Sequence, residues 1–202
     1  MEDCGCLGGR KGDPNGPATQ PSPQAGFVLF LADVNEASCA NLVGTTINLR
    51  DQGATEICLL LATTGGKVIS GFAAHHTLRG LGVKLVTHNV GSINSIGNVL
   101  FLAGDERFAC PHSTFMFHGV LWGVPAGNMT GQQTREILAS ITADEERISA
   151  LIAERTNLTT EQVEAFFRDA ATKDAEYALG VGIIDAVAPV DIPPGATLNW
   201  IT

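Results

Sequence analysis

The chain has 202 residues, of which 45% are hydrophobic and only 16% are charged, and its formal net charge is -9. A chain of this length can bury one continuous hydrophobic core, so we expect one globular domain. The acidic balance and the lack of a Lys/Arg cluster argue against a nucleic-acid backbone or an anionic membrane surface as the partner.

The two ends of the chain differ in composition from its middle. Residues 1–25 are polar and rich in Gly and Pro, so we expect a flexible leader without the apolar segment of a signal peptide. No apolar run is long enough to cross a membrane and the five cysteines form no CxxC pair, which favours a soluble protein in the reducing cytoplasm. We assign no role to Cys4 and Cys6 in the leader. Residues 191–202 are predicted to be an extended C-terminal tail.

Between these ends, strand and helix patterns alternate along the chain. Apolar strands that alternate with helices predict a mostly parallel sheet covered by helices. The predicted strands cover residues 27–33, 56–62, 83–90, 107–109 and 113–118, and the predicted helices cover residues 36–50, 68–82 and 96–103.

A long helix from residue 130 to about residue 155 is the most distinctive of the later elements. Its apolar residues recur at helical spacing with acidic residues between them, as an amphipathic helix requires. A further helix begins near Thr159 or Thr160, either of which can cap its N-terminus. Residues 174–187 then predict a short helix followed by a strand.

Ser95 lies between a predicted strand and the apolar helix that begins near Ile96. A hydroxyl at a helix N-terminus has free N–H groups and the positive end of the helix dipole beside it, which is where an oxyanion is stabilised. Ser95 is therefore a candidate nucleophile, although a serine in this position is more often only a helix cap.

Two further segments complete the candidate chemistry. The segment TTGG at residues 63–66 follows a buried strand, and its paired glycines suit either an oxyanion hole or a plain tight turn. His118 ends the strand at 113–118 and is the best-placed base for an activated serine. No nucleotide-binding motif and no histidine pair with metal-ligand spacing occurs, so we predict neither a cofactor nor a metal.

Taken in order, the segments TTGGKVISG, GSINSIG, RFACPHSTFMFHG and DAEYALGVGIID resemble the Clp protease proteolytic subunits of the Clp protease and crotonase superfamily. The resemblance covers about residues 27–190. It implies an α/β fold, a crotonase/Clp-protease-like superhelix of repeated β-β-α units in a domain of residues 26–190. The long helix, at about residues 130–156, corresponds to the protruding handle helix by which such subunits stack ring on ring.

The same resemblance implies a serine endopeptidase. Ser95 occupies the position of the nucleophile and His118 that of the general base, while the N–H groups of Gly66 and Ile96 match the oxyanion hole. The implied substrates are peptides or unfolded proteins, which a ring-shaped homo-oligomer hydrolyses through an acyl-enzyme inside its chamber.

The sequence departs from the family at three places. An alignment without gaps puts Ala170 where the family has its aspartate, so Asp169, one residue earlier, is the first candidate for the third triad member. Asp174 is a further candidate, although its place before a short helix also suits an N-cap. Ser92 and Asn94 replace residues that are mostly small. The leader does not resemble the family's N-terminal segment, which argues against an ATPase unfoldase as partner without excluding one.

Two alternatives to an active peptidase stay open. Ala170 in the acid position is compatible with an inactive subunit that assembles with an active homologue. Crotonase-like relatives use the same backbone oxyanion hole for acyl-CoA thioesters, but Lys67 is essentially the only basic residue near the TTGG segment. The serine endopeptidase is the function that we expect.

Overall fold

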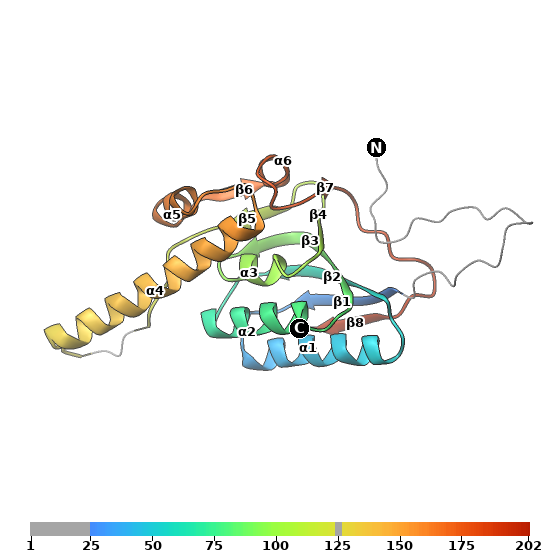
Figure 1. The fold of residues 1–202 in the computed structure, drawn as a ribbon, viewed down its shortest axis with the longest axis horizontal. Helices are drawn as coiled ribbons and strands as arrows, with labels where there is room; N and C mark the ends of the chain where they lie inside the picture. Colours follow the sequence, from blue (N-terminus) through green and yellow to red (C-terminus); the bar gives the residue numbers. More distant parts are fainter. Residues whose placement is uncertain (1–24, 124–126) are drawn as a thin grey trace, which may run out of the picture.

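The fold is organised around one mixed sheet of eight strands (Figure 1). The computed structural model describes residues 25–123 and 127–202, so nearly all of the predicted leader, with Cys4 and Cys6, lies outside the described residues. The sheet has the order β6-β5-β3-β2-β1-β8, and β4 lies between β3 and β7. Every described strand pair is parallel except β5 with β6. The strands are β1 (Ala25–Leu31), β2 (Glu56–Thr63), β3 (Lys84–Asn94), β4 (Glu106–Ala109), β5 (Thr114–Met116), β6 (Thr172–Asp174), β7 (Ala186–Val187) and β8 (Leu198–Ile201).

Strand β3 is long enough to pair with two neighbours in succession. Its residues 86–89 pair with β4, whereas residues 92–94 pair with β5. On its other side β3 pairs in parallel with β2, and Thr63 lies opposite Ile93. Because the carboxyl ends of parallel strands meet at one edge of the sheet, the loops that follow β2, β3 and β5 begin close together.

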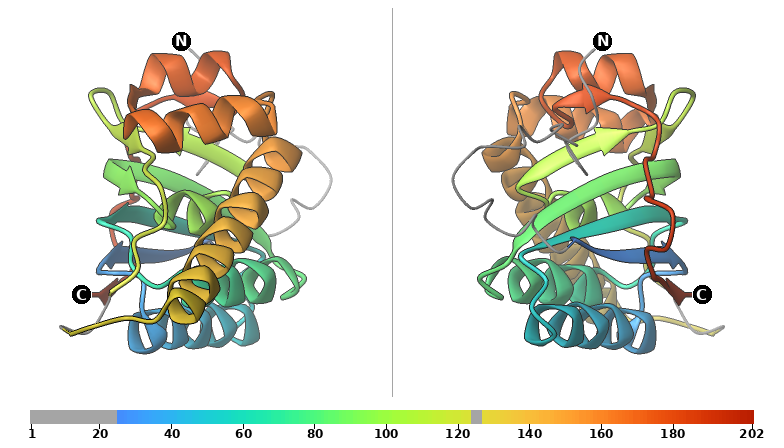
Figure 2. Two further views of the ribbon diagram at one scale, coloured as in Figure 1. Left: turned by 90° about the vertical axis from the view of Figure 1, so that its left-hand side faces the viewer. Right: turned by 90° about the vertical axis from the view of Figure 1, so that its right-hand side faces the viewer.

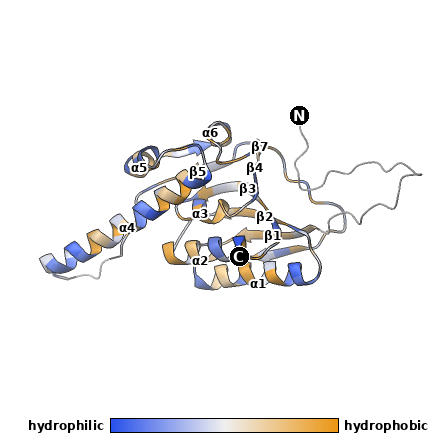
Figure 3. Ribbon diagram, in the orientation of Figure 1, coloured by the Kyte–Doolittle hydropathy of each residue, from blue (hydrophilic) through white to orange (hydrophobic). Residues whose placement is uncertain are grey.

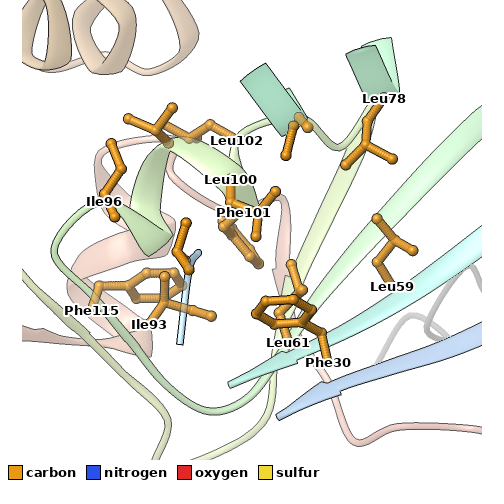
Figure 4. Close-up of a cluster of buried hydrophobic side chains, with 14 of the residues drawn as sticks. Phe30, Leu59, Leu61, Leu78, Ile93, Ile96, Leu100, Phe101, Leu102 and Phe115 are labelled. Carbon is orange, nitrogen blue, oxygen red and sulfur yellow. The ribbon is translucent and has the colours of Figure 1, made fainter. Parts of the chain in front are cut away.

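Helices α1 (Glu36–Asp51), α2 (Val68–Arg79) and α3 (Gly97–Phe101) cover one face of this sheet (Figures 1 and 2). Their apolar side chains pack with those of the central strands into the main core, part of which Figure 4 shows. All of β2 except Ala62 is buried, as expected of a parallel strand covered on both faces. The helix predicted at residues 96–103 is shorter in the structure, because residues 102–104 already turn toward β4.

Helix α4 (Gly131–Arg155) confirms the predicted long helix and projects from the body of the molecule (Figure 1). Its C-terminal turns bury Ile148, Leu151 and Ile152, whereas Leu138 in the projecting half is 61% exposed. Hydrophobic and hydrophilic residues both occur along the projecting half (Figure 3). Among the described residues, no helix combines the length and apolarity that a membrane span needs.

Two shorter helices follow α4, and a side chain caps the N-terminus of each. Thr159 caps α5 (Thr160–Asp169), since its side chain accepts the N–H of Gln162. Asp174 caps α6 (Ala175–Gly180), since its Oδ1 accepts the N–H of Tyr177 at 2.8 Å. Both caps satisfy N–H groups that a helix otherwise leaves without partners.

The C-terminal segment contains a strand that the sequence pattern did not predict. Residues 198–201 form β8, which pairs in parallel with β1 and closes that side of the sheet. The segment leading to it crosses the face of the sheet that the helices leave open (Figure 2). A second apolar cluster, centred on Phe27, Leu60 and Phe108, lies on that face and packs against Val190 and Leu198.

Candidate active site

Ser95 lies in the turn between β3 and α3, in a strained backbone conformation. Its φ is 55°, in the left-handed region that residues with a side chain rarely adopt. The Ser95 N–H donates to the Met116 carbonyl at 2.8 Å, which ties this turn to the end of β5. A left-handed serine between a strand and a helix exposes its hydroxyl at the edge of the sheet, an arrangement seen in nucleophile elbows.

Asn98 holds the same turn from inside α3. Its Nδ2 donates to the Ser95 carbonyl at 3.0 Å and to the Met116 carbonyl at 2.9 Å, and the side chain is only 2% exposed. The sequence analysis did not single out this residue. The available signal was a lone amide in an otherwise apolar helix, because a buried amide is costly unless it forms hydrogen bonds.

α3 is also fixed from α2, where His75 is buried. The His75 Nδ1 lies 2.8 Å from the Val99 carbonyl, and because a carbonyl only accepts, Nδ1 carries the proton. Burial lowers the pKa of His75 to about 4. This histidine is therefore neutral near pH 7 and serves as a hydrogen-bond donor in the core.

The TTGG segment adopts a turn that only glycine fits. Gly65 and Gly66 have φ values of 94° and 147°, and a Cβ on Gly66 would lie 2.2 Å from the Val34 carbonyl oxygen. Val34 binds the turn through two backbone hydrogen bonds of 2.7 Å. Its N–H donates to the Gly65 carbonyl, and its carbonyl accepts from the Lys67 N–H. Close approach of two backbones explains the paired glycines here.

Two N–H groups beside Ser95 have no acceptor among the described residues. Within the described part of the chain, neither the Gly66 N–H nor the Ile96 N–H donates a hydrogen bond. A Cβ on Gly65 would lie 2.7 Å from the Ser95 Cβ, so the glycine turn and the serine are in direct proximity. Unpaired backbone donors beside a nucleophile are what an oxyanion hole requires.

His118 joins this group because β5 pairs with the end of β3. Met116 lies opposite Asn94 in that pairing, so the residue two positions further along lies beside the Ser95 turn. Ser95 and His118 line one cavity of about 260 Å³, together with Gly66 and Ile96. Apolar side chains form most of the remaining wall, and Asp33 contributes a carboxylate.

The Ser95 hydroxyl and the His118 ring form no direct hydrogen bond within the described residues. The His118 Nδ1 lies instead 2.6 Å from the carbonyl of its neighbour Gly119. Catalytic hydrogen bonds are often long or poorly aligned without substrate. His118 therefore stays a candidate base although it forms no hydrogen bond with Ser95 in the described residues.

Within the described residues, neither of the two candidate acids forms a hydrogen bond or an ion pair with His118. Asp169 is the last residue of α5 and is exposed, and Ala170 after it ends the helix in a left-handed conformation with φ of 48°. Asp174 forms the N-cap of α6. Glu145 of α4 contacts the segment that follows His118, since its Oε1 accepts the Val120 N–H at 2.9 Å. Sequence reasoning missed Glu145, because nothing in the pattern of α4 distinguishes it from the acidic residues beside it.

A larger cavity of about 740 Å³ lies on the other side of Asp33 and Thr64, which line both cavities. Ser92 and Asn94 contribute to its wall, and the Ser92 hydroxyl donates to the Asn94 Oδ1 at 2.6 Å. These two departures from the family pattern therefore lie at a cavity adjoining the candidate nucleophile.

The described residues offer little for a metal or a phosphate group. They contain no group of three or more His, Cys, Asp or Glu side chains that could hold a metal ion. Burial raises the pKa of the Cys39 and Cys110 thiols, which disfavours the reactive thiolate. Lys67 lies 3.5 Å from Glu36, so the cation beside the glycine turn already has an acidic neighbour.

Comparison with known proteins adds independent information. A family model described as Clp protease matches residues 24–191. A protein named ATP-dependent Clp protease proteolytic subunit 2 from Prochlorococcus marinus is 32% identical over 166 residues, which is 79% of this chain and 81% of the relative. A protein with the same name from Chlamydia trachomatis serovar D is 27% identical over 166 residues, covering 80% of this chain and 79% of the relative. The matches confirm the resemblance and the fold class expected from the sequence.

Proposed function

The chain belongs to the Clp protease family, and from that premise we propose that it is a serine-type endopeptidase subunit with Ser95 as its nucleophile. His118 is the general base, and the N–H groups of Gly66 and Ile96 form the oxyanion hole. The family supports a peptidase role in general. The serine-type chemistry is the more specific part of the proposal.

One observation carries the proposal. A serine in a left-handed turn, a histidine and two residues whose backbone N–H groups have no acceptor in the described part of the chain line the same cavity, although they come from three separate loops. In the proposed reaction His118 takes the Ser95 proton and the Ser95 oxygen attacks a peptide carbonyl. The two N–H groups stabilise the resulting oxyanion, His118 protonates the departing amine, and water then hydrolyses the acyl-enzyme.

We further propose that the subunit works in a ring-shaped homo-oligomer on peptides or unfolded proteins. The projecting half of α4 supports this, because Leu138 is exposed there and Trp122 and Met129 are exposed beside it. Apolar side chains on a projecting element mark a contact surface. The relatives are named ATP-dependent, and for this chain a partner ATPase rests on that likeness alone.

The test is intact-mass spectrometry of the purified oligomer after exposure to a fluorophosphonate probe. We expect one adduct per chain in the wild type and none in Ser95→Ala, with labelling slowed at least a hundredfold in His118→Ala. A wild type that stays unlabelled while folded and assembled would refute the active site.

A specific observation favours one alternative, the inactive subunit. Asp169 is exposed and Ala170 occupies the family's acid position, so the usual third member is missing from its place. An unlabelled wild type that enters mixed oligomers with an active homologue would establish this alternative.

A further inference from the structure

The hydrogen bond of His118 defines its tautomer. Its Nδ1 lies 2.6 Å from the Gly119 carbonyl oxygen, and a carbonyl has no proton to give. The proton is therefore on Nδ1, and Nε2 keeps the lone pair that a general base needs. In a serine-type triad the acid has this task, because it accepts from Nδ1 and holds the ring in the correct tautomer.

The peptide unit that accepts from His118 is itself bound to a carboxylate. The Gly119 carbonyl and the Val120 N–H belong to the same peptide group, and that N–H donates to the Glu145 Oε1 at 2.9 Å. A hydrogen bond to a carboxylate is roughly twice as strong as a neutral one. It also polarises the peptide, which makes the carbonyl on the opposite side a stronger acceptor.

The residues around the Gly119–Val120 peptide favour its contact with Glu145. A Cβ on Gly119 would lie 2.8 Å from the Glu145 Oε1, so the missing side chain lets the carboxylate approach. The Gly119 N–H donates to the Phe167 carbonyl at 3.2 Å, which holds the segment from α5 as well. Among the described residues Glu145 has no ion-pair partner, whereas Asp144 beside it pairs with Arg147 at 2.7 Å.

We infer that Glu145 is a positioning residue that orients and polarises His118 through the Gly119–Val120 peptide, in place of the acid missing at residue 170. The inference rests on the proposed function. Its negative charge, one peptide away, also favours the imidazolium that forms when His118 takes the Ser95 proton. The acid contribution thus comes from the interior of α4 rather than from the end of α5.

The experiment measures the maximal rate and the half-saturating concentration of fluorophosphonate labelling for the assembled protein. Glu145→Ala is expected to lower the maximal rate about tenfold to a hundredfold while leaving the half-saturating concentration unchanged. Glu145→Gln keeps an oxygen that can accept the Val120 N–H but lacks the charge, so its maximal labelling rate should lie between those of the wild type and Glu145→Ala. Glu146→Ala, at the exposed neighbouring position, and Asp169→Asn should label at the wild-type rate.

A double-mutant cycle separates positioning from a general structural effect. If Glu145 acts through His118, adding Glu145→Ala to His118→Ala causes no further loss of labelling. Wild-type labelling in both Glu145 variants, or an equal further loss in the His118→Ala background, would overturn the inference. If Glu145→Ala does not assemble, the labelling rate of Glu145→Gln and its double-mutant cycle with His118→Ala test the inference instead. An unlabelled wild type would instead refute the proposed function, so the two failures are distinguishable.

Discussion

The left-handed conformation of Ser95 predicts an unusual order of stabilities between two variants that lack the proposed nucleophile. Ser95→Ala and Ser95→Gly both remove the hydroxyl, which donates no hydrogen bond to the described residues. Only glycine also relieves the backbone, since φ at this position is 55°. The glycine variant should therefore be the more stable of the two.

The size of the difference follows from two opposing effects. A left-handed conformation costs a residue with a side chain roughly 1 to 2 kcal/mol. Glycine loses more backbone entropy on folding, which offsets about 0.5 to 1 kcal/mol of that gain. At the midpoints of these two ranges the net advantage of glycine over alanine is about 0.75 kcal/mol, or an increase in Tm of about 1.5 to 3 °C for a chain of this size.

Urea and thermal unfolding at one protein concentration would measure this difference, because assembly raises the apparent stability. The same pair of substitutions at Ser149, inside α4, provides the control. At this helical position the order should reverse, with Ser149→Gly about 1 kcal/mol less stable than Ser149→Ala. A Ser95→Gly variant no more stable than Ser95→Ala would contradict a strained nucleophile turn.

Two other predictions concern the supports of this turn. Asn98→Ala should lower the free energy of unfolding by about 1 to 3 kcal/mol and slow fluorophosphonate labelling, since it removes the two hydrogen bonds from the Asn98 side chain to the Ser95 and Met116 carbonyls. A full labelling rate with full stability would show that these two hydrogen bonds do not hold the Ser95 turn. Burial lowers the pKa of His75 to about 4 from an ordinary 6.5, so the unfolded chain binds its proton first and stability should fall as the pH drops from about 6.5 toward 4. Denaturation midpoints across that range should decline less steeply in His75→Asn, and equal slopes in both proteins would exclude His75 as the cause.

Most elements of the fold were predictable because they depend on local patterns. The uninterrupted apolar run of β2 and the helical spacing in α4 are properties of neighbouring residues, and both elements formed as expected. The sequence left two threonines as candidates for the N-cap of α5, and the side chain of Thr159 is the one that accepts the Gln162 N–H. Strand β8 was missed because its four residues gain their stability from pairing with β1, more than 170 positions away.

The same distinction between local pattern and tertiary structure applies to the candidate site. The sequence by itself determined that Ser95 precedes an apolar helix, that paired glycines follow a buried strand and that His118 ends another strand. Only the tertiary structure decided that these loops meet, because the pairing of β3 with β2 and β5 sets their register. The positioning residue that we propose shows the difference most clearly. Linear spacing pointed to Asp169 as the acid, whereas the contact of Glu145 with the Val120 N–H depends on how α4 packs beside the strand end, which no local pattern encodes.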